Sequence, residues 1–505
     1  MNGSNAVYTA GNVGIGTTTP TSALEVNGTG RFTNTLTLNP ASDLALNLST
    51  GSVYKGGTLF LHSKGGGNNT ALGLFALSNV TTGTNNTAHG TNALFPNTTG
   101  DFNTAIGGFT LGSNTTGFNN TAIGSSVLIS NTTGNFNTAI GSNALSANNT
   151  GNDNTASGSS ALFSNTTGFD NTAIGRSALS SNTTGNSNTA VGKSALFSNT
   201  TGSNNTASGR DSLRFNTTGF ENTAIGKDAL RNNTTGFSNT ATGAFALLAN
   251  TTGNSNTVLG NSALGSNSTG NANTAIGSAA LGFNITGASN TAIGTSALFF
   301  STGTGNIAVG FQAGLNLTTG GNNISIGNLG VAAESSTIRI GASGNQTRAF
   351  VAGIRGVTTV NADAIPVLID SAGQLGTVSS SRRFKEDIRD MGSSTDRLLD
   401  LRPVLFKYKQ DQTMPDGSPV PPEYGLIAEE VAQIFPDLVV YDEKGVPFTV
   451  KYHILSSMLI NEVKKMKAEH EQVVAKLEAR VTRLENVEAE LARLMAKVNA
   501  IAEQR

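Results

Sequence analysis

A repeat of 17 residues dominates the 505-residue sequence. The unit reads N-T-A-I-G-x-x-A-L-x-x-N-T-T-G-x-x and recurs in phase from Asn69 to Asn290, which makes 14 copies, and two looser copies begin at Asn306 and Asn323. A fixed period of this length is typical of repeat proteins, in which each repeat contacts only its neighbours. We therefore expect a stack of similar units rather than a globular domain.

Comparison of the copies within the chain shows which positions the fold fixes. The fifth position of the 14 in-phase copies is always Gly, from Gly73 to Gly294, and the ninth is always Leu, from Leu77 to Leu298. A constant Gly indicates a positive φ or a close backbone approach, and a constant Leu indicates a core site of fixed size. The third position is nearly always Ala, which indicates tight packing. The fourth varies between Ile and Ser or Thr, which indicates a half-buried site.

Seventeen residues suffice for two short strands and two turns, with N-T-T-G and the constant Gly as corners. We therefore predict that each repeat is one rung of a β-solenoid or β-roll. Sixteen rungs spaced by about 4.8 Å would form a rod roughly 75 Å long. A helix is disfavoured because Asn, Thr and Gly dominate and no 3.6-residue pattern appears. Each rung offers few apolar side chains, which is a thin core for one chain.

The many Asn and Thr residues have two interpretations. In the first, they stack along the rod as hydrogen-bonded ladders and turn residues. In the second, they form a carbohydrate-binding or glycosylated face, because N-T-T and N-N-T triplets match the glycosylation acceptor pattern. We favour the first, since the sequence shows no secretory signal.

The repeats at 69–327 resemble the heads of trimeric autotransporter adhesins and of phage tail fibres, in which N-T-A-I-G or S-x-A-I-G units form trimeric β-rolls. The resemblance implies a homotrimer and says nothing about a receptor. Residues 1–68 contain G-N-V-G-I-G-T at 11–17 and L-E-V-N-G at 24–28. We predict a β-rich attachment or shaft segment there, and a rod of repeats over 69–330.

Composition excludes several classes of function. The net charge is −1, and no basic stripe with interleaved aromatic residues is visible in the first 380 residues, so nucleic-acid binding is not expected. There is no Cys, and four scattered His residues form no ligand cluster, so we expect no metal and no cofactor. No signal peptide and no apolar run long enough to span a bilayer is visible, so membrane insertion is not expected.

The C-terminal part of the chain is built differently. Of the 63 charged residues, 40 lie after residue 380. Short apolar runs between glycines, T-I-R-I-G at 337–341, F-V-A-G-I-R-G at 350–356 and V-L-I-D-S-A-G-Q-L-G at 367–376, predict a β connector over 331–379. Mixed patterns predict a small α+β module over 380–454, and a helix is expected over 455–501 within a coiled-coil domain at 455–505.

A heptad pattern fits this helix, with nine of twelve core positions apolar. The a positions are Ile460, Lys467, Val474, Val481, Glu488 and Met495, and the d positions are Val463, His470, Leu477, Leu484, Leu491 and Val498. Val at a with Leu at d favours two strands by the rules for peptides. The trimer implied by the repeats, together with the thin rung core, leads us to expect three.

Residues 380–465 resemble the intramolecular chaperone peptidase domain at the ends of phage endosialidases, tail spikes and tail fibres. The shared motifs are Ser-x-x-Arg-x-Lys at 380–385, F-K-Y at 406–408, G-L-I-A-E-E-V at 425–431, Pro436 and the terminal helix. In that family the domain drives trimerisation and then releases itself, because a serine–lysine dyad cuts just before the serine. The resemblance thus implies Ser380 as nucleophile, Lys385 as general base and Ser379–Ser380 as the bond cut.

The chemistry of such a dyad sets clear requirements. A serine hydroxyl needs a base, and a lysine serves as one only if desolvation or nearby cations lower its pKa. Arg382 and Arg383 are candidates for that cationic influence. The position after the serine, commonly Asp in the family, is Ser381 here. The five-residue offset to Lys385 selects Ser380 among three adjacent serines.

We therefore expect a homotrimeric tail-fibre or surface-fibre protein for host or surface attachment, matured by a single-turnover self-cleaving serine peptidase rather than acting as a metabolic enzyme. The alternatives are a bacterial adhesin-like head protein with the same chaperone domain, and a glycan-degrading tail spike with catalysis in the rod. Candidate partners are a cell-surface glycan or other receptor, and a virion or fibre-base protein at the N-terminus. The expected location is a virion tail fibre, or the extracellular or cell surface.

Overall fold

A computed structural model describes most of the chain after residue 66. The described residues are 6–9, 11–15, 19, 24–26, 53–55, 58–62, 67–352, 354, 364–409 and 421–503. They divide into two compact units, Met1–Val351 and Ala352–Arg505.

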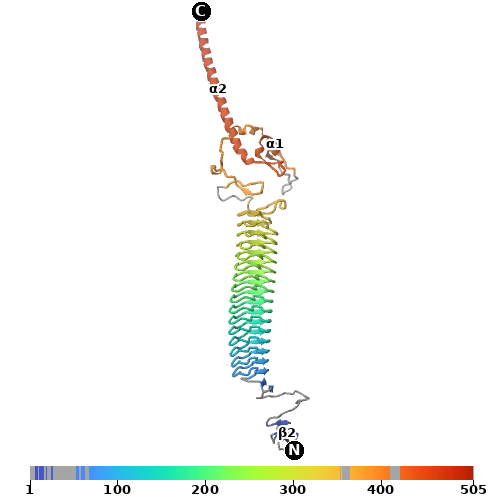
Figure 1. The fold of residues 1–505 in the computed structure, drawn as a ribbon. Helices are drawn as coiled ribbons and strands as arrows, with labels where there is room; N and C mark the ends of the chain where they lie inside the picture. The colour runs from blue at the N-terminus through green and yellow to red at the C-terminus, as the bar shows by residue number, and fades with distance from the viewer. Residues whose placement is uncertain are drawn as a thin grey trace. The chain divides into compact units, whose positions relative to one another are not determined.

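The first unit is a rod of stacked rungs (Figure 1). Each rung contributes one three-residue strand, and consecutive strands pair in parallel with a shift of one repeat, so that Thr121, Ala122 and Ile123 lie opposite Thr138, Ala139 and Ile140. The strands are β6 (Thr70–Leu72), β7 (Thr87–His89), β8 (Thr104–Ile106), β9 (Thr121–Ile123), β10 (Thr138–Ile140), β11 (Thr155–Ser157), β12 (Thr172–Ile174), β13 (Thr189–Val191), β14 (Thr206–Ser208), β15 (Thr223–Ile225), β16 (Thr240–Thr242), β17 (Thr257–Leu259), β18 (Thr274–Ile276), β19 (Thr291–Ile293), β20 (Ile307–Val309), β21 (Ile324–Ile326) and β22 (Ile338–Ile340).

The predicted β-solenoid with 17-residue rungs is confirmed, but the expectation of two strands per rung is wrong. The second side of each rung is a run of turns. Its backbone groups still bond to the next rung; for example, the Leu128 N–H donates to the Ala144 oxygen at 3.1 Å and the Thr115 N–H to the Thr132 oxygen at 3.0 Å. The whole perimeter is therefore hydrogen-bonded along the rod, which satisfies the obligatory backbone donors and acceptors without a second strand.

The interior of the rod is narrow and closed within one chain. In the rung that begins at Asn137, Ala139, Ala144 and Leu145 are completely buried, and the equivalent residues of the other in-phase rungs are almost all buried as well. The fourth position lies on the outer face of the strand, where Ile140 is 43% exposed. Because this core needs no second chain to close it, the inference that a thin core requires three chains to share it is not supported.

The constant glycine has both features predicted for it, a positive φ and a close approach of neighbouring backbone. Gly107 has φ 131°, which L side chains rarely adopt, and a Cβ there would lie 2.1 Å from the Gly124 carbonyl oxygen of the next rung. The constant leucine lies in the core, as predicted, but its backbone conformation was not expected. Leu128, for example, has φ 50°. A bulky residue in the left-handed region is a true outlier. It is held there by full burial and by the bond from its N–H to the next rung.

Two columns of asparagine run through the interior. Asn120 Nδ2 donates to Asn103 Oδ1 at 3.1 Å and to the Gly134 oxygen at 2.8 Å, while Asn120 Oδ1 accepts from the N–H and Nδ2 of Asn137. Asn131, in the second column, donates to Asn114 Oδ1 at 2.8 Å and also to the Gly134 oxygen at 3.0 Å. Both columns are completely buried, so the ladder interpretation is confirmed for them. Glycosylation of N-T-T triplets such as the one at Asn131 is excluded by the same burial.

Short strands flank the rod. β1 (Ala6–Thr9), β2 (Asn12–Ile15) and β3 (Leu24–Val26) form one sheet, and β4 (Val53–Lys55) and β5 (Thr58–His62) pair antiparallel, with β5 against β6. Parts of the two N-terminal motifs lie outside the described residues. Of the predicted connector strands, 337–341 is confirmed as β22 and 367–376 as the hairpin of β23 (Leu368–Ile369) and β24 (Leu375–Gly376). At 350–356 the described residues form no strand.

The second unit is a small α+β assembly, as predicted. Its elements are the 3₁₀ turns η1 (Arg382–Phe384), η2 (Gly392–Thr395), η3 (Leu398–Asp400) and η4 (Pro436–Leu438), the strands β25 (Val404–Phe406), β26 (Glu423–Gly425), β27 (Val439–Tyr441) and β28 (Pro447–Val450), and the helices α1 (Ala428–Ile434) and α2 (Tyr452–Ala502). β25 pairs with β26 and β27 with β28, both antiparallel. The predicted terminal helix is confirmed as α2.

Candidate functional site

The second unit packs around one small apolar cluster. Val431 of α1 and Met458 of α2 lie in it, and Leu398 of η3 brings the segment that follows the serine motif against both helices. The remaining buried members are Leu438, Val439 and Val450. Val431, with Leu426 and Ala428 packed against the cluster, therefore makes G-L-I-A-E-E-V part of this core.

The predicted dyad lies on the surface of this single chain. Ser379, Ser380 and Ser381 are exposed, and the backbone of Ser381 is extended. The turn η1 follows them and is closed by a bond from the Lys385 N–H to the Arg382 oxygen at 3.1 Å. The Lys385 side chain is exposed as well. Within the described residues, no hydrogen bond joins Ser380 to Lys385, so the chain alone does not assemble nucleophile and base.

Arg383, one of the two auxiliary arginines, contacts an aromatic ring of the same motif. Arg383 lies over the Phe384 ring, with its guanidinium carbon 4.7 Å from the ring centre, and both side chains are exposed. Such a contact positions a cation near the motif but supplies no desolvation. In the described residues Lys385 thus lacks the low-dielectric surroundings that a lysine base requires.

A polar cluster that the sequence did not reveal anchors the start of α2. Glu462 is only 6% exposed; the Lys465 ammonium and the Thr395 hydroxyl both donate to its carboxylate. Asn461 Nδ2 donates to the Thr395 hydroxyl at 2.6 Å, and Lys465 bonds to Asp396 at 2.5 Å. The cluster thus ties η2 to the helix 67 residues later in the chain. No motif signals it, because Glu462 sits among exposed charges of the same helix.

These contacts make a prediction about pH. The hydrogen bond from Lys465, followed by that from Thr395, holds the pKa of Glu462 below its usual value of 4.5. A carboxyl whose pKa is lower in the folded state stabilises that state above its unfolded pKa, and this contribution is lost as the pH falls through the lower, folded value. The helical thermal midpoint of the full chain should therefore exceed that of Glu462→Gln at neutral pH, and the gap should shrink below about pH 4.5.

Circular dichroism at several pH values measures this gap. Glu469→Gln is the matched control, because Glu469 is exposed on the same helix and should leave the midpoint unchanged at every pH. A gap between wild type and Glu462→Gln that stays constant down to pH 3 would contradict the assignment.

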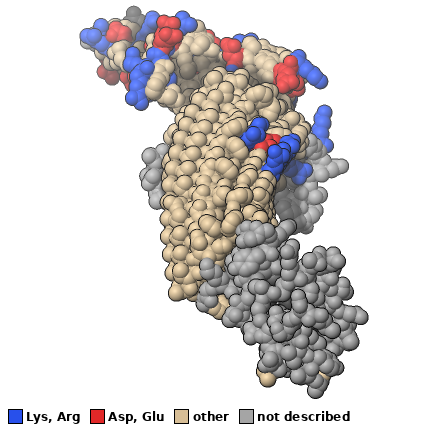
Figure 2. Space-filling view, turned by 60° about the horizontal axis from the view of Figure 1, so that its bottom comes forward, with Lys and Arg blue, Asp and Glu red and all other residues tan. Residues whose placement is uncertain are grey.

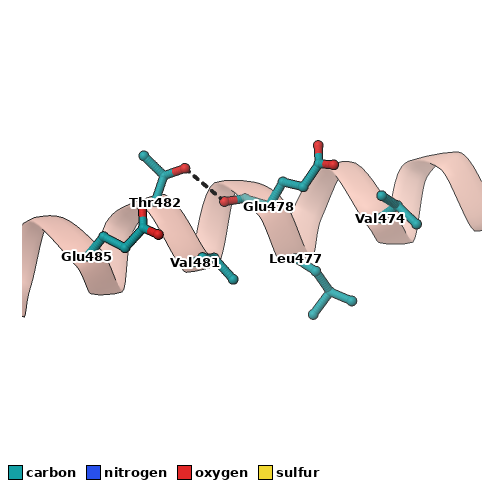
Figure 3. A pocket seen from close by; sticks show the side chains of 6 residues that line it. All are labelled: Val474, Leu477, Glu478, Val481, Thr482 and Glu485. Atoms are coloured by element: carbon teal, nitrogen blue, oxygen red, sulfur yellow. Dashed lines mark hydrogen bonds between the residues drawn. The ribbon is translucent and has the colours of Figure 1, made fainter.

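The rest of α2 carries an unpartnered apolar face. Leu477 and Leu484 of the predicted d positions are 54% and 55% exposed, and Val481 of the a positions is 52% exposed. Figure 3 shows Leu477 and Val481 projecting to one side of the helix, while Glu478 and Thr482 lie on the other. The structure describes one chain, in whose described part α2 packs against no second long helix, so the coiled coil stays a prediction.

The apolar face is wider than a and d alone. The residue before the a position is apolar at five of the six a positions, and Ile501 continues this spacing one heptad further. These six residues are Leu459, Met466, Val473, Val487, Leu494 and Ile501. All six are exposed. A face built from three heptad positions is typical of helices in bundles, whereas a two-stranded coiled coil needs only a and d.

Comparison with known families identifies this part of the chain. Residues 380–440 match the family model described as chaperone of endosialidase. The match begins at Ser380 and confirms the resemblance drawn from the motifs. The presence of this chaperone of endosialidase domain implies a trimeric, phage fibre-like protein that assembles with the help of its chaperone. No curated protein and no solved structure matches the chain significantly.

The described part of the chain holds neither a candidate metal site nor a candidate membrane span. No group of three or more His, Cys, Asp or Glu residues there could hold a metal ion, and no described helix is long and apolar enough to cross a membrane.

Proposed function

We propose that this chain is a homotrimeric tail-fibre or surface-fibre protein for host or surface attachment, whose C-terminal domain promotes trimerisation and then cuts itself off before Ser380. The match of 380–440 to the chaperone of endosialidase family, directly after a long rod, carries the proposal. In this proposal the rod gives the fibre its length and stiffness, and the chaperone domain explains why three chains assemble.

The wide apolar face of α2 supports three chains rather than two. Exposed Leu and Val over many turns cost free energy in water, and about 25 cal/mol is recovered for each Å² that association buries. A face at a, d and the preceding position exceeds what one partner helix covers. The a and d residues by themselves favour two strands, and the wider face is the reason that we propose three.

The cleavage step follows from the dyad. The Ser380 hydroxyl oxygen attacks the Ser379 carbonyl carbon while the Lys385 amine takes the hydroxyl proton. The peptide C–N bond breaks, the proton passes to the freed Ser380 nitrogen, and the Ser379 carbonyl is left as an ester on the Ser380 oxygen. Water then hydrolyses the ester. In this proposal the neighbouring chains of the trimer bury Lys385, so cleavage waits for assembly.

Removing the chaperone should abolish assembly. A chain expressed only to residue 379 should sediment as a monomer, whereas the full chain should yield trimers, because in this proposal the wide apolar face of α2 brings the three chains together. The double variant Leu477→Ala/Leu484→Ala should shift the full chain towards monomer as well. Analytical ultracentrifugation measures both.

Lys476→Ala/Arg483→Ala is the matched control for the helix. Both residues are exposed and lie one residue before the two leucines, off the apolar face, so the trimer should persist. Trimers formed by residues 1–379 alone, or by the leucine variant, would contradict the role given to the C-terminal domain.

A further inference from the structure

The rod carries its positive charge in one place. All six Lys and Arg residues between Asn69 and Gly330 lie in four consecutive rungs, the ones that begin at residues 171, 188, 205 and 222. The sixth position of these rungs forms what we call the basic column, which consists of Arg176, Lys193, Arg210 and Lys227. Figure 2 shows cations gathered around a small acidic patch on the rod, and the rest of the rod's face in view is uncharged.

Backbone pairing fixes the spacing of the basic column. The carbonyl oxygens of Arg176, Lys193 and Arg210 each accept a bond of 2.9–3.0 Å from the rung that follows. Successive cations therefore start one strand spacing, about 4.8 Å, apart. All four side chains are exposed. The linear sequence does not reveal this stripe of cations, because residues 17 apart in sequence become adjacent only when rungs stack.

Carboxylates hold one end of the column in place. Asp228 is nearly buried; Arg210 and Lys227 lie 3.9 and 4.0 Å from it, and Arg231 lies 3.6 Å from it. Asp211 forms an ion pair with Arg214, with 3.1 Å between the Asp211 carboxylate and the Arg214 guanidinium. At the other end, Arg176 and Lys193 make no ion pair within the described residues. Six cations thus face two carboxylates, and the two unpaired cations lie side by side.

Phenylalanine rings lie beneath the cations. The Arg214 guanidinium lies 5.3 Å from the centre of the Phe215 ring, and that of Arg231 lies 5.7 Å from the same ring. Lys227 lies 5.0 Å from the Phe245 ring. These contacts support the side chains while leaving their charges available. Because the rings already contact cations, they are poor platforms for stacking nucleic-acid bases.

We propose that the basic column binds a linear acidic polysaccharide that lies along the rod. Four cations at rung spacing match a polymer that repeats anionic groups along an extended chain, and Arg pairs well with carboxylate or sulfate groups. The flat rod suits a polymer better than a compact ligand, which needs a concave site. This inference rests on the proposed function as an attachment fibre and names the class of surface molecule that the rod recognises.

Titration calorimetry on the full chain tests the inference with four probes. Alginate presents carboxylates, heparin presents sulfates, dextran is neutral, and oligothymidylate is a single-stranded nucleic acid. The chain should bind alginate, heparin or both, should bind less tightly as salt is added, and should not bind dextran. The stronger of the two acidic probes then identifies the preferred anion.

The variant Arg176→Ser/Lys193→Ser should raise the Kd of the bound polysaccharide about tenfold or more. Serine occupies this position in two neighbouring rungs, at Ser142 and Ser159, so the thermal midpoint should not change. The control Arg176→Lys/Lys193→Arg keeps the charge and should change the Kd by at most about twofold.

Three results would overturn the inference: no binding of either acidic polysaccharide, equal binding of dextran, or tighter binding of oligothymidylate. The oligomeric state of the same preparation separates this failure from that of the proposed function. Trimers that bind no polysaccharide would refute only the ligand, and monomers that bind it would refute only the assembly.

Discussion

The variant Asn120→Asp should weaken the rod strongly, whereas Asn119→Asp, one residue earlier, should leave it intact. Asn120 is completely buried and uses its Nδ2 to donate to Asn103 and to Gly134. A carboxylate would place a charge against both acceptor oxygens. An uncompensated buried charge of this kind costs about 3 kcal/mol or more.

The control variant Asn119→Asp makes the same chemical change at the neighbouring residue. Asn119 is exposed, and the equivalent position is Asp153 and Asp170 in other rungs, so an acid is tolerated there, and the expected change is within about 0.5 kcal/mol. Denaturant unfolding compares the two variants. Burial raises the pKa of the introduced carboxyl at position 120, so the loss should lessen as the pH falls. Equal midpoints for both variants at neutral pH would contradict the asparagine ladder.

The architecture of the rod was predictable because the repeat itself reports local geometry. A constant Gly, a constant Leu and a near-constant Ala each mark an inward or close-packed position, and all three were placed correctly. The number of strands per rung was not predictable, since turn residues that bond from rung to rung look the same in sequence as turns that end strands. The left-handed backbone at Leu128 had no signal, because burial outweighs its conformational cost.

Features formed by residues far apart in sequence could not be predicted either. The basic column escaped notice because its members are 17 residues apart and nearly neutral sequence separates them. The contact of Thr395 with Glu462 joins segments 67 residues apart. The family of 380–440 was predicted from its motifs, but the site geometry could not be, because one chain leaves Ser380 and Lys385 exposed, with no hydrogen bond between them in the described residues.

Self-cleavage should convert the full-length chain completely into two products. After folding, the 505-residue chain should convert into a product that ends at Ser379 and a fragment that begins at Ser380. Ser380→Ala removes the nucleophile and Lys385→Ala removes the base, so each variant should assemble but stay whole. A lysine is a useful base near neutral pH only inside a packed site, so denatured chain and unassembled monomer should also stay whole.

Neighbouring serines serve as controls for the register of the cut. Ser381→Ala removes a hydroxyl one residue away and should still allow cleavage before Ser380. If Arg382 and Arg383 contribute only by their charge, then their replacement by Lys should slow cleavage less than their replacement by Ala.

The most direct test of this account is the intact mass of the purified, assembled protein, read with the N-terminal sequence of any released fragment. The account predicts chains that end at Ser379, a released fragment that begins at Ser380, and an uncut trimer from Ser380→Ala. A wild-type trimer that stays at full length would refute the peptidase assignment, and cleavage that persists in Ser380→Ala would show that Ser380 is not the nucleophile.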